Sequence, residues 1–311
     1  MRDLESDLSP YQRMPPRLIL NADDFGLTRG INRAIAELHT LGALTSATLM
    51  ASGPAFDDAV TVARAHPNLG VGCHIILTDG QPISPPHTIP TLIGPDNRTF
   101  RPTLSHFLRD LHLHRIDPAD ILCEAHAQIQ HLQHHGIDVT HIDTHKHTHI
   151  FPRVARPILA AAERTGVRAI RNPFEPSWSA DLSHASPLRR LQLRILYRLR
   201  SRFLGLPQIK SHSIRTTDGT LGIAATGHLD ATTLDAILSV IPPNSNNLWE
   251  IVCHPGYNDA DLDGIRTRLR STREVELSAL ISTFAPSSKQ SPQPRALKLI
   301  HYRDASRPHH S

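Results

Sequence analysis

The sequence predicts an α/β protein built on a parallel sheet, and two observations support this fold class. Short apolar segments alternate with segments whose apolar residues recur at helical spacing, most regularly between Arg17 and Ile170. Acidic or histidine residues directly follow several of the apolar segments, as expected where parallel strands end at the edge that carries a site. We therefore expect a β/α barrel of the TIM type, distorted or incomplete, with a doubly wound open sheet as the alternative.

Length and composition are those of an ordinary globular protein of 311 residues, although 22 histidines are far above usual. The formal net charge of +4 gives no reason to expect nucleic-acid binding. Three cysteines without CxxC spacing favour a reduced protein over a disulfide framework. The N-terminal residues lack the apolar core of a secretory signal, and no apolar run has the length of a membrane span. These features predict a cytoplasmic protein.

The first half of the chain gives the clearest element predictions. Residues 1–16 are expected to be a flexible lead-in. We predict strands at residues 17–21, 46–50, 70–77, 137–142 and 167–170, and helices between Thr28 and Gly42 and at residues 55–66, 117–135 and 152–165. Thr28 has the side chain of an N-cap, and Gly42 and Gly166 suit C-terminal caps. Residues 78–103 are rich in proline, glycine and polar residues and predict a long loop that acts as a lid, a binding loop or an insertion without a role.

The second half returns to the same alternation after an irregular stretch. We predict a basic helical insertion at about residues 187–205, helices at 230–241 and 272–283, and strands at 248–253 and 296–302. Residues 285–294 are rich in proline and serine and are expected to be loose. The chain is thus predicted to be a single domain over residues 17–302, followed by a tail at 303–311.

The insertion at 187–205 combines an apolar stripe with a row of like charges. The stripe is formed by Leu188, Leu191, Ile195, Leu199 and Phe203, and the adjacent row by Arg190, Arg194, Arg198 and Arg202. Arginines at successive i+4 positions repel one another unless something anionic faces them. The segment is therefore either a solvated helix flank or a surface that meets anionic lipid or a phosphorylated substrate.

Candidate site residues follow the predicted strands. Two adjacent carboxylates, Asp23 and Asp24, end the first strand, and they require a metal, a basic partner or a shared proton to coexist there. His74 lies on the third strand, and the run from Asp143 to His149 follows the fourth. One carboxylate oxygen with two imidazole nitrogens is a common open site for a divalent cation. We expect one ligand from the histidine run, with the remaining histidines positioning substrate or supporting the ligands.

Side chains alternate between the two faces of a strand, and this alternation predicts that the cysteines face away from the site. If His74 and His254 face the functional side of the sheet, then Cys73 and Cys253 face the helices. The cysteines are therefore predicted to contribute packing and not catalysis.

Four spaced motifs resemble the YdjC-like carbohydrate deacetylases, a family that includes chito-oligosaccharide deacetylases and hopanoid-associated deacetylases. They are Asn21-Ala22-Asp23-Asp24-Phe25-Gly26, Gly72-Cys73-His74, Asp143-Thr144-His145-Lys146-His147-Thr148-His149 and Cys253-His254-Pro255. The resemblance implies a distorted deacetylase-like barrel with Asp24, His74 and His145 as metal ligands. It also implies that Asp23 is the general base and His254 the acid. Cys73 and Lys146 depart from the residues usual at those positions, and neither is an implied ligand.

The expected activity is metal-assisted removal of the acetyl group from an N-acetylated amino sugar, with Mg²⁺ or Zn²⁺ as the cofactor. The saccharide is expected to be an oligosaccharide or a glycolipid head group, the latter if residues 187–205 contact a membrane. Another metallohydrolase, such as a phosphoesterase, and a non-catalytic sugar- or metal-binding protein are the alternatives. The roles of His147 and His149 stay open, as does homodimer formation.

Overall fold

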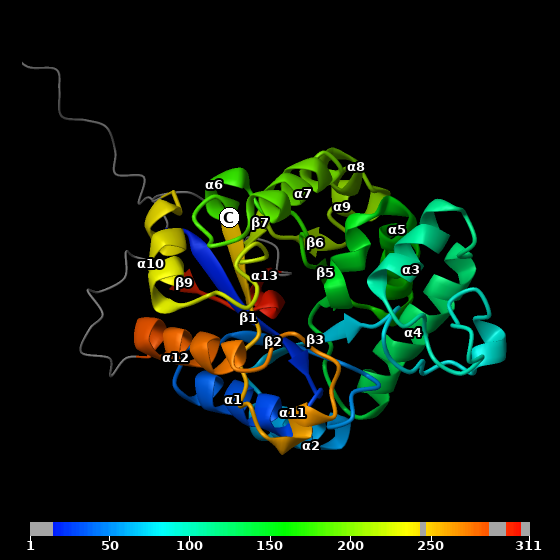
Figure 1. Cartoon of the computed structure of the whole chain (residues 1–311), viewed down its shortest axis with the longest axis horizontal. Coiled ribbons are helices and arrows are strands. Elements are labelled where there is room, and N and C mark those ends of the chain that lie inside the picture. Colours follow the sequence, from blue (N-terminus) through cyan, green and yellow to red (C-terminus); the bar gives the residue numbers. More distant parts are fainter. Residues whose placement is uncertain (1–14, 243–246, 286–296, 306–311) are drawn as a thin grey trace, which may run out of the picture.

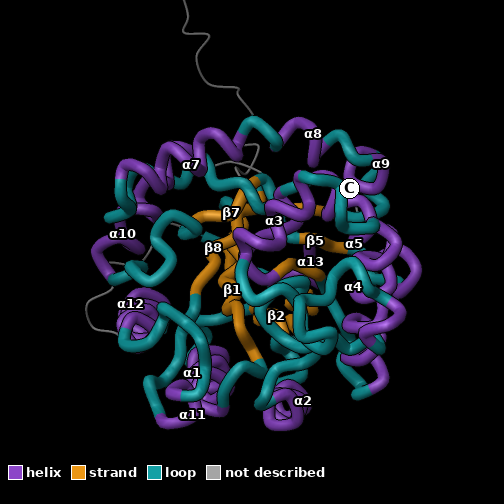
Figure 2. The backbone as a smooth tube through the Cα atoms, turned by 45° about the vertical axis from the view of Figure 1, so that its right-hand side comes forward, coloured by secondary structure: helices purple, strands orange, loops and turns teal. Residues whose placement is uncertain are grey.

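A parallel sheet lies at the centre of the molecule and helices surround it in the computed structural model (Figures 1 and 2). The structure describes residues 15–242, 247–285 and 297–305. The predicted lead-in, the loose segment at 285–294 and the tail therefore lie largely outside the described residues. None of the described helices is both long and apolar enough to cross a membrane.

The strands follow one another around the sheet almost in chain order. Their order is β6-β5-β4-β3-β2-β1-β8-β7, with β9 paired to β1, and each pairing is parallel. The strands are β1 (Arg17–Phe25), β2 (Ser46–Leu49), β3 (Gly70–Ile75), β4 (Ile142–Thr144), β5 (Ala169–Ile170), β6 (Arg215–Thr216), β7 (Gly219–Leu221), β8 (Leu248–Cys253) and β9 (Lys298–Leu299). No pairing joins β6 to β7 among the described strands, so the sheet curls without closing. The predicted incomplete barrel is confirmed, and the doubly wound sheet is wrong.

Helices connect the strands, and most of them cover the outside of the sheet (Figure 2). They are α1 (Arg29–Thr40), α2 (Phe56–Ala65), α3 (Leu104–His112), α4 (Pro118–His134), α5 (Pro152–Thr165), α6 (Ser177–Ala180), α7 (Pro187–Tyr197), α8 (Arg200–Leu204), α9 (Pro207–Lys210), α10 (Ala231–Val240), α11 (Ala260–Asp263), α12 (Thr272–Phe284) and α13 (Tyr302–Ala305). Two 3₁₀ segments are η1 (Pro86–Thr88) and η2 (His145–Ile150). Thr28 caps α1 by accepting a hydrogen bond from the Ile31 N–H, as predicted.

Most predicted elements are present, and the differences concern short or irregular ones. The predicted strand at 137–142 is wrong, because β4 covers only Ile142–Thr144. The last predicted strand shrinks to Lys298–Leu299 and is followed by α13. The predicted helix at 187–205 is split into α7 and α8, and α3, β6 and β7 have no counterpart among the predictions.

The two faces of β1 divide the core from the site. Leu18, Leu20 and Ala22 are buried in the main apolar cluster beneath the helices. The intervening side chains point to the inside of the curled sheet, where Ile19 packs with Tyr302 of α13. Cys73 and Cys253 are both buried in the main apolar cluster, so their predicted packing role is confirmed. Towards the carboxyl ends of the strands the inside of the sheet becomes polar.

Candidate metal centre and its surroundings

The end of β1 departs from strand geometry, and this brings two neighbouring carboxylates to the same place. The register with β2 shifts between Ala22 and Phe25, and Asp24 has a left-handed backbone with φ of 65°. Side chains of adjacent strand residues would otherwise face opposite sides of the sheet. A non-glycine residue in this conformation is a typical feature of functional sites. Asp23 and Asp24 therefore both line the site, and both are buried.

Three donor atoms converge beside this turn. Nε2 of His74 lies 3.7 Å from Oδ1 of Asp24, and Nδ1 of His145 lies 3.6 Å from the same oxygen. The two imidazole nitrogens are 3.3 Å apart. Ligand atoms about 2.0–2.2 Å from a tetrahedral zinc ion are about 3.3–3.6 Å from one another. The three residues predicted to bind a metal are thus brought together at separations that fit one divalent cation.

A buried carboxylate orients His74. Nδ1 of His74 donates a hydrogen bond of 2.7 Å to Oδ1 of Asp143, which leaves Nε2 directed at Asp24 and His145. Ligand histidines in metal sites are held by carboxylates in this way. Burial lowers the pKa of His74, but the Asp143 carboxylate outweighs it and raises the pKa to about 9. His74 must therefore lose a proton before Nε2 can bind a cation at neutral pH.

The histidine run after β4 is a tight turn and not an extended segment. Lys146 and His147 have left-handed backbones with φ of 59° and 52°. His149 is buried, with its Nδ1 2.6 Å from Oγ1 of Thr144 and its Nε2 3.2 Å from the carbonyl oxygen of Arg171. Strand alternation consequently does not apply here. His145 contributes to the three-donor cluster, whereas His149 makes structural hydrogen bonds.

His147 has a different environment from its neighbours. Its Nδ1 is shielded from solvent and lacks a hydrogen-bond partner among the described residues. Burial, and then the Arg171 guanidinium, lower the pKa of His147 well below its usual range. A neutral imidazole thus lies near the Arg171 and Asp23 charges.

Asp23 is held by a fully buried arginine. Arg171 donates two hydrogen bonds to it, NH2 to Oδ1 at 2.7 Å and NH1 to Oδ2 at 2.9 Å. The same guanidinium contacts Asp143 at 2.5 Å and Glu250 at 2.7 Å. Burial raises the pKa of Asp23, but Arg171 more than offsets it, so the pKa lies below its usual value. Asp23 is therefore a fixed, ionised carboxylate.

A second buried arginine pairs with Asp24. NH2 of Arg273, on α12, lies 2.6 Å from Oδ2 of Asp24, and the arginine side chain is fully buried. Burial raises the pKa of Asp24, but Arg273 and then His145 outweigh it and lower the pKa well below its usual range. One carboxylate oxygen is thus occupied by an arginine, while Oδ1 faces the two histidines.

His254 lies between two carboxylates, Asp23 and Glu276. Its Nε2 is 3.9 Å from Oδ2 of Asp23, and its Nδ1 is 3.9 Å from Oε2 of Glu276. Glu276 also accepts hydrogen bonds from the N–H groups of His254, at 2.5 Å, and Gly227, at 2.9 Å. Glu276 therefore fixes the backbone that carries His254. The imidazole sits within one water molecule's reach of Asp23.

The long loop at 78–103 is tied to the histidine turn. Nζ of Lys146 lies 2.9 Å from Oδ2 of Asp79, at the start of the loop. Glu124 of α4 accepts hydrogen bonds of 2.9 Å from the N–H groups of Ile83 and Ser84. The loop is thus pinned at these points beside the site, and Lys146 serves this contact and not the metal cluster.

Several residues around the site were missed by sequence reasoning. Asp143 stands in the recognised run without an assigned role, and Arg171 directly follows the predicted fifth strand, so both carried a positional signal. Arg273 and Glu276 lie on α12, and nothing in their spacing connects them with the strand ends.

Comparison with known proteins identifies the family. A carbohydrate deacetylase of Geobacillus stearothermophilus is 30% identical over 292 residues, covering 94% of this chain and 98% of that protein. One of Brevibacillus brevis is 39% identical over 158 residues, which cover 51% of this chain and 60% of the relative. An Enterococcus faecalis V583 protein named for cellobiose-phosphate cleavage has the same fold, with a TM-score of 0.68 and 24% identity over 93% of this chain and 98% of that one. The model of YdjC-like proteins matches residues 17–287. The chain therefore belongs to the YdjC-like family.

Proposed function

We propose that this protein is a metal-dependent hydrolase that removes the acetyl group from an N-acetylated amino sugar. The observation that carries the proposal is the convergence of Asp24, His74 and His145 beside an ionised Asp23, which in turn lies 3.9 Å from His254. A protein that only binds sugar needs no such acid–base pair. Relatives named carbohydrate deacetylase support the choice of substrate class.

The metal ligands in this proposal are Asp24, His74 and His145. Their one oxygen and two nitrogen donors suit Zn²⁺, and they also admit Mg²⁺ when water completes its coordination. A divalent cation bound there supplies Lewis acidity, which polarises an amide carbonyl and makes water more acidic.

The remaining site residues transfer protons and hold the charged groups in place. Asp23, held ionised by Arg171, accepts the proton of the attacking water through Oδ2, the oxygen nearer His254. His254, as imidazolium, protonates the departing sugar amine, and Glu276 holds its position. Arg273 keeps Asp24 ionised and leaves its Oδ1 directed at the two histidines. The two adjacent carboxylates thus have separate tasks.

Residues 17–302 are proposed to act as one catalytic unit. Strand β1, which carries Asp23 and Asp24, pairs with β8, which precedes His254, and with β9 near the C-terminus. The two ends of the described chain therefore belong to one sheet.

The substrate class is tested by measuring acetate release from a panel of N-acetylated saccharides. The same metal-loaded protein is tested on generic phosphoesters, because an Asp/His metal site can also activate water toward phosphorus. We expect acetate release from at least one saccharide and no comparable phosphate release. The opposite pattern would replace the proposal with a phosphoesterase.

Replacing Asp143 with asparagine should weaken metal binding by about 10- to 100-fold, the usual effect of removing a carboxylate behind a ligand histidine. The change removes the acceptor that fixes His74 Nδ1 and leaves the three proposed ligands in place. Titration calorimetry with Zn²⁺ measures the affinity, with the exposed Asp181→Asn as the matched control. Unchanged affinity in Asp143→Asn would remove His74 from the ligand set.

Metal affinity is also expected to rise with pH. The pKa of His74 is raised to about 9 without a metal, so a proton and the cation compete for Nε2 below that pH. The apparent association constant should increase by about tenfold per pH unit up to about pH 9, then level off. A pH-independent Zn²⁺ affinity between pH 6 and 8 would contradict this competition.

A further inference from the structure

Helix α7 turns its apolar stripe to the outside. Leu188, Leu191 and Ile195 are 65%, 53% and 51% exposed, and Tyr197 at the helix end is 37% exposed. None of the helix residues is buried. Of the predicted stripe only Phe203, on α8, is buried. Most stripes of this kind pack on a core, so an outward stripe marks a surface that meets another molecule.

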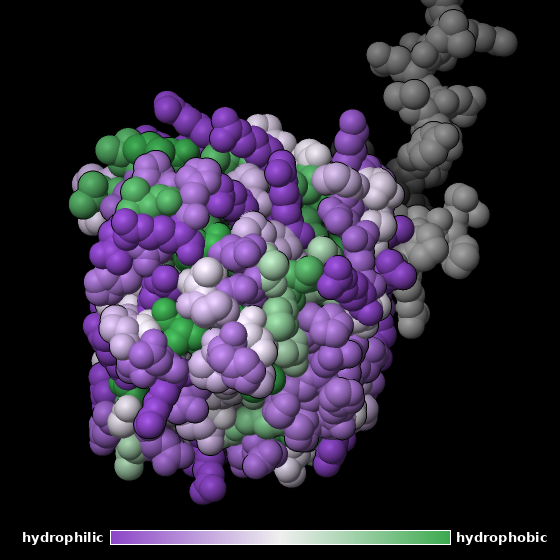
Figure 3. All heavy atoms as spheres, turned by 90° about the vertical axis from the view of Figure 1, so that its right-hand side faces the viewer, coloured by the Kyte–Doolittle hydropathy of each residue, from purple (hydrophilic) through white to green (hydrophobic). Residues whose placement is uncertain are grey.

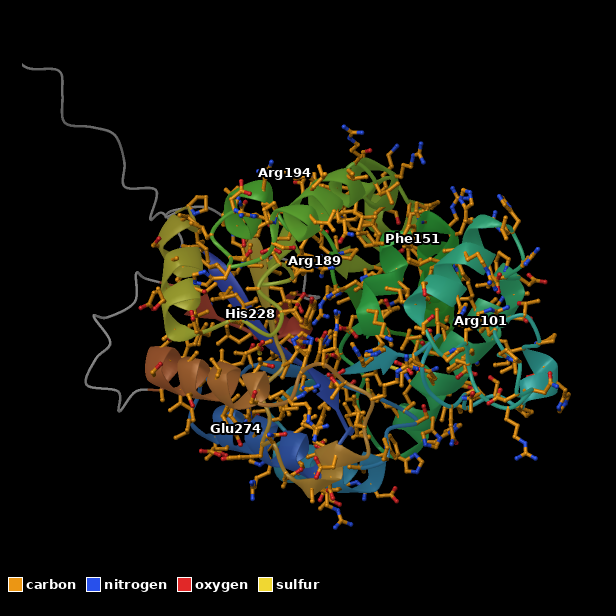
Figure 4. The ribbon with its side chains drawn as sticks, in the orientation of Figure 1. Arg101, Phe151, Arg189, Arg194, His228 and Glu274 are labelled. Atoms are coloured by element: carbon orange, nitrogen blue, oxygen red, sulfur yellow. The ribbon has the colours of Figure 1, made fainter. Side chains whose placement is uncertain are left out.

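The same helix region is strongly basic. No acidic residue occurs between Asp181 and Asp218. Six arginines lie on α7, on α8 and between them, namely Arg189, Arg190, Arg194, Arg198, Arg200 and Arg202. Arg194 forms an ion pair with Asp181 at 2.8 Å. Within the described part of the chain, no carboxylate lies within ion-pair distance of Arg198 or Arg202, both of which are exposed. Figure 4 shows Arg194 on the outer side of α7 and Arg189 on the side toward the middle of the molecule.

The apolar and basic side chains form one continuous face. Figures 1 and 2 both place α7 and α8 along one edge of the molecule, and Figure 3 shows hydrophobic side chains gathered with hydrophilic ones at that edge. We call this face the α7 face and define it by Leu188, Leu191, Ile195, Arg198 and Arg202. Aliphatic side chains within a basic helix surface are typical of helices that lie in the headgroup region of a membrane.

The positive charge of the α7 face indicates which kind of molecule binds there. A second copy of the chain related by a twofold axis would place arginines opposite arginines, which is unfavourable. A neutral apolar partner would leave them without counter-charges. An anionic bilayer complements both kinds of side chain. Its lipid phosphates pair with the arginines, and the upper part of its acyl chains accommodates the leucines and the isoleucine.

We propose that the α7 face docks the protein on anionic phospholipid membranes. The helix borders the edge of the sheet that carries the site, because Leu193 packs against a small cluster that contains Ala224, just beyond the carboxyl end of β7. Docking therefore brings that edge close to the lipid surface. The inference deepens the proposed function by favouring a membrane-anchored saccharide, and the docking itself is tested without reference to catalysis.

The test is co-sedimentation of the full chain with vesicles of phosphatidylcholine alone or with about 30% phosphatidylglycerol. We expect binding to the anionic vesicles only, weakening as salt rises from about 0.1 M to about 0.5 M. Arg198→Glu with Arg202→Glu should lower the vesicle partition coefficient by about thirtyfold or more, since each lost arginine contributes about fivefold. Leu191→Ser with Ile195→Ser should lower it by about tenfold or more.

Two control pairs test whether vesicle binding depends on the α7 face or only on the net charge and exposed apolar area of the protein. Arg164→Glu with Arg168→Glu changes two other exposed arginines and alters net charge equally. Leu113→Ser with Val275→Ser removes two other apolar side chains, which are 49% and 47% exposed. Both control pairs should bind vesicles as the unchanged protein does.

Three results would overturn the proposal. They are absence of binding to anionic vesicles at low salt, equal binding to neutral vesicles, and control pairs that lose as much binding as the α7 pairs. A dimer seen by analytical ultracentrifugation and dissolved by Leu191→Ser with Ile195→Ser would also overturn it in favour of self-association. Acetate release from a soluble N-acetylated saccharide should be unchanged in the α7 variants, so failure of docking and failure of the proposed activity are distinguishable.

Discussion

Replacing Asp23 with asparagine is expected to lower kcat for acetate release by about 10²- to 10⁴-fold, the range for losing a general base. The amide cannot take a proton from water, although its oxygen can still accept a hydrogen bond from Arg171. Asp23 does not belong to the three-donor cluster of Asp24, His74 and His145, and the second group of donors, Asp23, His74 and Asp143, has Arg171 as its cation. Metal affinity should therefore stay within about threefold of the unchanged protein, well below the effect of losing a ligand.

Asp24→Asn is the matched comparison, because it changes the neighbouring carboxylate in the same way. Its metal affinity should fall by more than about 100-fold. Loss of a residue that only supports a ligand through a hydrogen bond typically costs about 10- to 100-fold. Steady-state kinetics and Zn²⁺ titration on both variants give the two readouts. If Asp23→Asn lost the metal while Asp24→Asn kept it, the roles assigned to the two carboxylates would be reversed.

Replacing Arg171 with methionine should lower the free energy of unfolding by about 3–5 kcal/mol, as for other buried ion pairs that lose one partner. Arg171 is completely buried and lies within 2.5 to 2.7 Å of Asp143, Asp23 and Glu250. Its removal leaves three carboxyl groups facing one another without the cation that they share. Urea unfolding followed by circular dichroism measures the difference at pH 7.

The loss of stability in Arg171→Met should become smaller as the pH falls. Arg171 depresses the pKa of Asp23 and that of Asp143 below their usual values, against the effect of burial. Stability from a depressed carboxyl pKa is complete above the unfolded value and is lost as the pH falls through the folded one, so the deficit of Arg171→Met should shrink as the pH falls below about 4. Arg164→Met, at an exposed position, should change stability by no more than about 0.5 kcal/mol. An Arg171→Met deficit no larger than that of the control would show that the buried network does not support the fold.

The regular parts of the fold follow from local sequence signals. The α1 and α5 boundaries are marked by Thr28 and Gly166, whose capping roles need no tertiary information. The two-residue strand β6 is too short to produce a periodic pattern, and it exists because the neighbouring strand β5 supplies its hydrogen bonds. The sequence alone does not decide between the two interpretations of residues 187–205, since periodicity shows that a helix has an apolar side and does not show what covers it.

The site was partly predictable because its residues stand at strand ends. Sequence position placed Asp24, His74 and His145 at one edge of a parallel sheet, and the structure brings them together. The left-handed turn at Lys146 and His147 was not predictable from composition, and it is what separates the position of His145 from that of His149. Arg273 reaches Asp24 from a helix 249 residues away, so only the assembled fold connects them.

We expect that a divalent cation held by Asp24, His74 and His145 is required to hydrolyse a sugar amide. The most direct measurement is acetate release from an N-acetylated saccharide by chelator-treated protein, before and after Zn²⁺ or Mg²⁺ is restored. Activity should vanish on chelation, return as about one ion binds per chain, and stay absent in Asp24→Asn at the same metal concentration. Undiminished acetate release by the metal-free protein would contradict the account.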